Sequence, residues 1–108
     1  MISVNGTTIT MTRGDTVRIQ IGIKDGNNDY TPQEGDVIQF TAKRYLNATS
    51  AAISKTIPNN TLILAFEPSD TNKLPYGSYL YDIQLTYANG DVDTFISGSL
   101  VLLGEVTT

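Results

Sequence analysis

LPYGSYLYDIQLTY, residues 74–87, holds the longest alternating strand pattern in the chain. From Tyr79 to Tyr87 the odd positions are tyrosine, isoleucine or leucine, whereas the even positions include Asp82 and Gln84. An apolar residue at every second position is typical of a β-strand with one buried face. The stretch therefore predicts a core strand entered through a tight turn at 74–77, and the other segments are its expected neighbours.

A second strand pattern follows directly, at residues 92–103. Asn89-Gly90 predicts a type I′ turn, so this strand pairs antiparallel to the first. Its apolar residues fall into two sets of opposite parity, and one buried face cannot hold both. Either a β-bulge at Gly98 shifts the register or a partner covers the second set. We take that second set as candidate interface residues: Phe95, Val101 and Leu103.

Shorter strand patterns precede this pair. They lie at residues 2–4, 7–12, 16–24, 37–44, 52–57 and 61–66. Pro68 and the polar residues after it are typical of a helix start. We expect at most one short helical turn near 69–74, capped by Ser69 or Asp70.

About seven short strands joined by turns predict an all-β fold, an antiparallel immunoglobulin-like β-sandwich, with a closed barrel as the alternative. In such sandwiches a tyrosine at the start of one strand hydrogen-bonds back to the preceding backbone, an arrangement called the tyrosine corner. Tyr79 is the candidate and Tyr81 the second choice. A length of 108 residues predicts a single domain over 1–108.

The composition excludes most catalytic chemistry. The chain has no cysteine and no histidine, which rules out disulfides, thiol nucleophiles and histidine-dependent acid–base or metal schemes. We expect no enzyme activity, no catalytic residue and no cofactor. The formal net charge of −4 disfavours nucleic acid and membrane surfaces as partners. We also expect neither a signal peptide nor a transmembrane segment, because no suitable apolar run is present.

Two sets of polar side chains have spacings that suit chemistry. Asp25, Asn27 and Asp29 resemble part of a calcium-binding loop, but they also suit an ordinary hairpin turn, which we favour. Asp91 and Asp93 would lie about 7 Å apart on one strand, within the range of glycosidase carboxylate pairs. Beside an exposed hairpin neither would hold a proton near neutral pH, so we interpret them as solubilising charges.

The tyrosines divide into two groups. Three share the expected core face, namely Tyr79, Tyr81 and Tyr87. The other three lie in expected loops, where their rings could stack on sugars: Tyr30, Tyr45 and Tyr76. They support the alternative function, a carbohydrate- or surface-binding β-sandwich module.

One set of turn and strand motifs spans most of the chain. It consists of Arg13-Gly14-Asp15-Thr16, Asp25-Gly26, Glu34-Gly35-Asp36 before Ile38-Gln39-Phe40, Asp70-Thr71 to Leu74, Gly77-Ser78-Tyr79-Leu80-Tyr81-Asp82-Ile83, and Gly98 to Val106-Thr107. Together these motifs resemble small β-sandwich domains in virion proteins of phages and prophages of Gram-positive bacteria. The resemblance implies a non-enzymatic structural protein of the tail, baseplate or head decoration, assembled in the bacterial cytoplasm. It also implies partners among other virion proteins or a homo-oligomer.

Overall fold

The computed structural model describes residues 2–5, 8–25 and 28–106, and the side chains of residues 8–23 and 28–106. Strands dominate these residues, which confirms the all-β class. The elements are β1 (Ile2–Asn5), β2 (Thr8–Thr12), β3 (Val17–Gln20), β4 (Lys24–Asp25), β5 (Asn28–Asp29), β6 (Val37–Lys43), β7 (Ile53–Ile57), β8 (Ile63–Phe66), α1 (Pro68–Thr71), β9 (Gly77–Thr86) and β10 (Val92–Leu103). The strand pattern expected at 16–24 is divided between β3 and β4.

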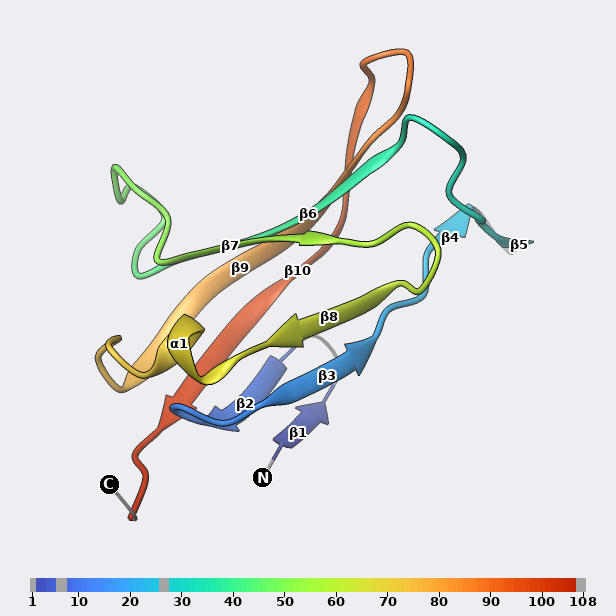
Figure 1. Ribbon diagram of the computed structural model, residues 1–108. Coiled ribbons are helices and arrows are strands. Elements are labelled where there is room, and N and C mark those ends of the chain that lie inside the picture. The colour runs from blue at the N-terminus through green and yellow to red at the C-terminus, as the bar shows by residue number, and fades with distance from the viewer. Residues whose placement is uncertain (1, 6–7, 26–27, 107–108) are drawn as a thin grey trace.

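Six strands form one curled sheet in the order β1-β2-β10-β9-β6-β7, while β3 pairs with β8 and β4 pairs with β5 (Figure 1). The hairpin of β9 and β10 is antiparallel, as Asn89-Gly90 predicts. β2 and β10, however, run parallel, which corrects the expectation of an entirely antiparallel fold. Turn signals reveal only strands that are neighbours in sequence. Most of the chain separates β2 from β10, so no turn indicates their pairing.

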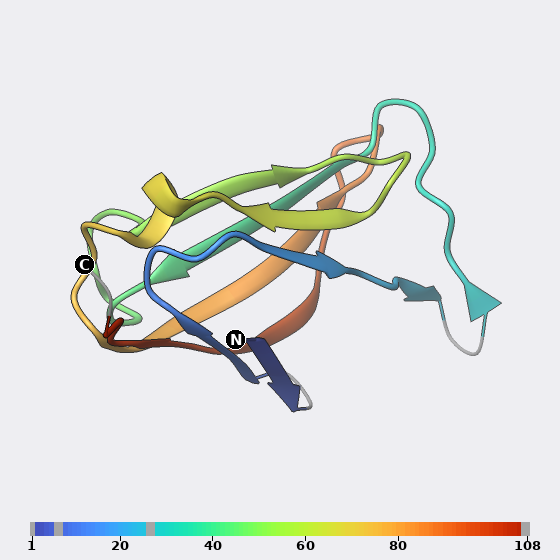
Figure 2. The ribbon, with the colours of Figure 1, turned by 60° about the horizontal axis from the view of Figure 1, so that its bottom comes forward.

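The six-stranded sheet and the β3–β8 pair face each other across the core (Figure 2). The odd residues of β9 from Tyr79 to Leu85 are buried, in agreement with the sequence pattern. The rings of Phe40 on β6 and Phe66 on β8 meet edge to face between the layers, with centroids 5.4 Å apart. Phe40 also stacks on Tyr81 at 5.2 Å. Such ring pairs add about 0.5–1.5 kcal/mol beyond area burial, so they help to hold the layers together.

β10 contains a bulge, but not at the expected position. Gly98 pairs regularly with Tyr81, and the register shifts instead between Thr94 and Ile96. The extra residue is Phe95, and both Phe95 and Ile96 pack against the core. A bulge lets two successive residues share one side of a strand. β10 thereby buries part of the second apolar set within its own chain.

α1 begins after Glu67 and has Pro68 in its first turn. The N-cap residue is therefore Glu67 and not Ser69 or Asp70, although Asp70 contributes to the capping as the third helical residue. Proline suits the first helical position because its fixed φ is already helical and its missing N–H has no helical partner there. The Asp70 carboxylate instead accepts a hydrogen bond from the Glu67 backbone N–H at 2.7 Å.

Side-chain contacts attach α1 to both neighbouring segments. Lys55 of β7 forms a 3.0 Å ion pair with Asp70. Thr71 is buried, and its hydroxyl oxygen accepts a 2.8 Å hydrogen bond from the Gly14 backbone N–H, in the turn after β2. At four residues α1 is far too short to cross a membrane, and the described part of the chain contains no longer helix.

Candidate functional site

The outer face is the solvent-facing surface of β2, β10, β9, β6 and β7. Strand alternation places every second residue of these strands on it, opposite the core. Most of these side chains are hydroxyls and amides. They are the alternate residues from Thr8 to Thr12, Val37 to Lys43, Ser54 to Thr56, Ser78 to Thr86 and Ser97 to Leu103.

Two neighbouring rows of side chains cross the middle of the outer face, each running over β6, β9 and β10. Opposed side chains on antiparallel strands have Cβ atoms about 4.5–5.5 Å apart, so each row is continuous. The rows are Thr41, Asp82 and Ser97, and Lys43, Leu80 and Ser99.

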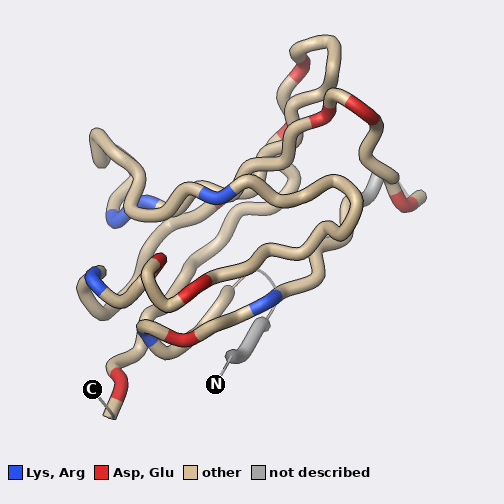
Figure 3. Tube along the Cα trace, viewed as in Figure 1, with Lys and Arg blue, Asp and Glu red and all other residues tan. Residues whose placement is uncertain are grey.

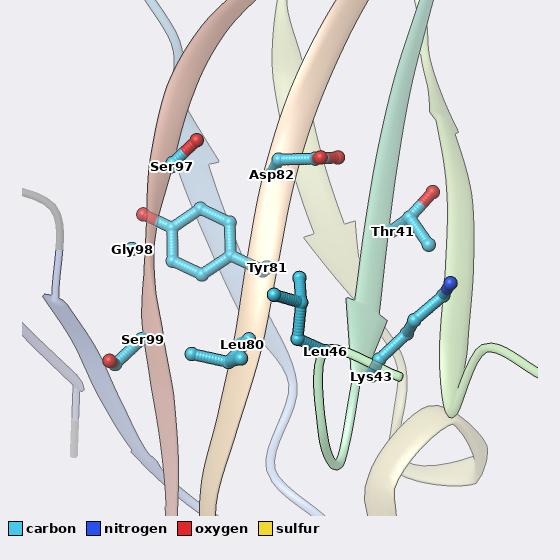
Figure 4. Close-up of a pocket in the computed structure, with 9 residues that line it drawn as sticks. All are labelled: Thr41, Lys43, Leu46, Leu80, Tyr81, Asp82, Ser97, Gly98 and Ser99. Atoms are coloured by element: carbon cyan, nitrogen blue, oxygen red, sulfur yellow. The ribbon is translucent and has the colours of Figure 1, made fainter. Parts of the chain in front are cut away.

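A hollow of about 440 Å³ lies over these two rows (Figure 4). Its lining consists of Thr41, Lys43, Leu46, Leu80, Tyr81, Asp82, Ser97, Gly98 and Ser99. Leu46, on the loop after β6, lies beside Leu80 in this hollow. Leu46 is 83% exposed and Leu80 is 45% exposed. Exposed leucines within a polar rim are typical of a protein-binding surface.

Lys43 and Asp82 are the two charged residues that the described strands place on the outer face. Neither side chain forms an ion pair with another described residue. The remaining charges lie mainly elsewhere: acidic residues gather at the end formed by the β9–β10 hairpin and the loop before β6 (Figure 3). The outer face is therefore electrically neutral in a chain whose net charge is −4.

On a second part of the outer face, between β6 and β7, the polar side chains hydrogen-bond to one another. The Gln39 side-chain amide donates to the Ser54 hydroxyl at 2.7 Å. Its carbonyl oxygen accepts from the Thr56 hydroxyl at 2.9 Å. Both ends of this amide are used, so the β6–β7 side of the face presents few unpartnered polar groups.

The three candidate interface residues do not share one surface. Val101 is half-buried and Leu103 is 47% exposed. Both lie on the outer face, opposite Thr10 and Thr12 of β2. Phe95 is the bulge residue and contributes to the core.

The calcium candidates lie at the β4–β5 hairpin. The backbones of Asp25 and Asn28 pair there, which agrees with the turn interpretation. Asp29 is exposed. Asn27 and the Asp25 side chain lie outside the described residues. Among the residues that the structure does describe, no group of three acidic side chains is arranged to hold a metal ion.

Asp91 and Asp93 are both exposed at the β9–β10 hairpin. The Asp91 backbone N–H donates to the Asn89 side-chain oxygen at 2.9 Å within the turn. Solvent surrounds both carboxylates, so the geometry supplies no enclosed acid–base pair.

Asp36 is a buried acid with a structural role. It accepts hydrogen bonds from the Tyr30 hydroxyl at 2.5 Å, the Gln33 N–H at 2.8 Å and the Ala88 N–H at 3.1 Å. These bonds, that of Tyr30 above all, hold the pKa of Asp36 below its ordinary value. They join the loop before β6 to the β9–β10 hairpin.

Arg13 joins separate segments in a similar way at the opposite end of the molecule. Its guanidinium binds both carboxylate oxygens of Glu105, at 3.2 and 2.7 Å, and donates to the Leu74 carbonyl at 3.1 Å. The hydrogen bond from Arg13 lowers the pKa of Glu105. The segment after β10 is thereby fixed to the turn after β2.

The tyrosines proposed to stack on sugars do not converge. The Tyr30 ring meets Tyr87 edge to face at 5.8 Å, beyond the end of β9. Tyr76 lies before the start of β9, where Arg13 covers its ring at 4.1 Å. Tyr45 is 64% exposed on the loop after β6. Tyr30 and Tyr76 therefore lie at opposite ends of β9.

The hollow is only partly visible in the strand pattern. The parity of Lys43, Leu80 and Asp82 indicates that they point away from the core, and this signal was present in the strand pattern. Leu46 stands on a loop without periodicity, so only the tertiary structure brings it beside Leu80. Comparison with protein-family models, curated proteins and solved structures finds no match to the chain.

Proposed function

We propose that this protein is a non-enzymatic structural module of a phage or prophage particle, an accessory protein of the tail, baseplate or head that is assembled in the bacterial cytoplasm. The observation that carries the assembly role is the outer face, where Leu46 and Leu80 are exposed over a hollow with a polar rim. An apolar centre with a polar rim is the arrangement found at protein–protein interfaces.

The chemistry of the residues supports a role without catalysis. The chain has no histidine and no cysteine. Its best-placed acids already serve structural contacts: Asp36 joins two loops, Asp70 holds α1, and Glu105 binds Arg13. A carboxylate committed to such bonds is a poor proton donor near neutral pH.

We also infer an immunoglobulin-like arrangement. The three strands β6, β9 and β10 face the β3–β8 pair, and β7 is added beyond β6. Tyr79 at the start of β9 makes the hydrogen bond of a tyrosine corner. Immunoglobulin-like sandwiches combine these features. The assignment to a virion rests on the resemblance of the turn and strand motifs to those of virion domains.

Particle purification tests the proposal. Induced phage particles of the source bacterium are separated by density gradient, and an antibody to this chain is applied in immunogold microscopy. We expect labelled tails or heads. Leu46→Asp should reduce incorporation, because it places a charge in the hollow. Val106→Asp is the matched control, since Val106 is fully exposed and does not line the hollow. Unlabelled particles that contain none of this chain would overturn the proposal.

A further inference from the structure

We propose that the outer face binds the outer face of a second copy of this chain. The resulting dimer is two-fold symmetric, and Lys43 of each copy forms an ion pair with Asp82 of the other. The inference rests on the proposed assembly function and names the partner that this surface takes.

The register of β6 and β9 supplies the geometry. Lys43 lies opposite Leu80, and Thr41 lies opposite Asp82. These four residues form a quadrilateral in which Lys43 and Asp82 occupy one diagonal, about 7–8 Å long. A two-fold axis that lies in the interface along the other diagonal brings Lys43 of each copy close to Asp82 of the other, within reach of the flexible lysine side chain.

That single symmetry operation makes two contacts of opposite charge. Each Lys43 comes to lie near the Asp82 of the second copy, and Leu80 of each copy lies close to the axis. A two-fold interface must be complementary to itself. The outer face meets this condition because its two charges differ in sign and flank an exposed leucine.

Electrostatics favours the outer face over the rest of the surface as the contact between two copies. The chain carries a net charge of −4, so two copies repel each other on average. The outer face is neutral, and its two charges have no ion-pair partner among the described residues. The end formed by the β9–β10 hairpin would instead place acidic residues against acidic residues (Figure 3).

Burial of apolar side chains supplies the attraction between the two copies, and the ion pairs set their relative orientation. Leu46 is 83% exposed and Leu80 is 45% exposed, and both line the hollow. Stacking the two faces brings Leu80 of both copies together at the axis, with Leu46 at the edge of the contact, which reduces the exposure of both side chains to water. Charge pairs at such a contact set the register and the choice of partner.

Charge reversal tests the pairing by sedimentation equilibrium over a concentration series. We expect a concentration-dependent dimer for the wild-type chain. Lys43→Glu and Asp82→Lys should each weaken it roughly tenfold or more, because each places like charges together at two symmetric sites. The double variant K43E/D82K should recover wild-type affinity, since it exchanges the charges and restores both pairs.

Matched controls separate the pairing from net charge. Lys73→Glu changes the net charge as Lys43→Glu does, and Asp93→Lys changes it as Asp82→Lys does. Lys73 and Asp93 are exposed and have no ion-pair partner among the described residues. Both controls should dimerise nearly as well as the wild-type chain. Thermal melts should show that every variant remains folded.

Two results would overturn the inference: a wild-type chain that stays monomeric throughout the series, or a double variant no tighter than the single variants. These results are independent of the particle experiment. A monomeric chain found in purified particles overturns the pairing alone, whereas a dimer absent from particles overturns only the proposed function.

Discussion

The hydroxyl of Tyr79 donates a 2.7 Å hydrogen bond to the carbonyl oxygen of Pro75. Tyr79 is 2% exposed, and the bond fixes the loop between α1 and β9. Tyr79→Phe should lower the free energy of unfolding by about 1 kcal/mol, because the ring stays packed while the hydrogen bond is lost. Urea unfolding measures this. Tyr45→Phe, at an exposed site, is the control, and an equal loss in both variants would contradict the corner's role.

The Thr71 hydroxyl oxygen accepts a hydrogen bond from the Gly14 backbone N–H in the protein interior, where water cannot take the place of that oxygen. Thr71→Val keeps the shape but leaves this donor unpaired, so the free energy of unfolding should fall by about 1–3 kcal/mol. Thr71→Ser retains the hydroxyl and should lose less. Chemical denaturation compares the two variants. A serine variant no more stable than the valine variant would show that packing, and not the hydrogen bond, matters at this site.

Asp36 should make the fold sensitive to acid. Hydrogen bonds from Tyr30, Gln33 and Ala88 lower the pKa of Asp36 in the folded state. The unfolded chain therefore binds the proton more readily, and stability falls as the pH drops through the folded-state value. The contribution is complete above the ordinary carboxyl pKa, about 4.

Asp36→Asn should accordingly lower the melting temperature at neutral pH and reduce its further fall in acid. The melting temperature of this variant should still fall somewhat in acid, because Arg13 also lowers the pKa of Glu105. Thermal melts from neutral pH to about pH 3 measure both effects. Asp93→Asn, at an exposed carboxylate, should keep the wild-type slope. An Asp36→Asn curve parallel to that of the wild-type chain would exclude a role for Asp36 in the acid response.

Substitution of Phe95 tests whether this residue belongs to the core or to an interface. Because the bulge turns it against the core, Phe95→Ala should lower the free energy of unfolding. We expect about 1–2 kcal/mol, less than the 3–5 kcal/mol typical of a fully buried phenylalanine. Self-association should be unchanged. Denaturation measures the free energy of unfolding, and sedimentation of the same preparation measures self-association. Weaker association without a loss of stability would show that Phe95 belongs to an interface and not to the core.

Strand positions were largely predictable from the sequence. β6, β7, β9 and β10 lie where alternation and turn residues indicate, because both signals are local properties of the chain. The corner hydrogen bond of Tyr79 follows from its place at the start of β9. The bulge at Phe95 was not predictable in the same way, because its position depends on which side chains the core has room to bury.

The sequence by itself determined the all-β class, the strand periodicities, the β9–β10 hairpin and the absence of thiol and imidazole chemistry. Only the tertiary structure decided that β2 runs parallel to β10, that Leu46 lies beside Leu80, and that Lys43 and Asp82 share one neutral face. The physical reason is the range of the interactions. Turn and alternation preferences act over a few residues, whereas strand pairing and surface composition depend on segments that meet only when the chain folds.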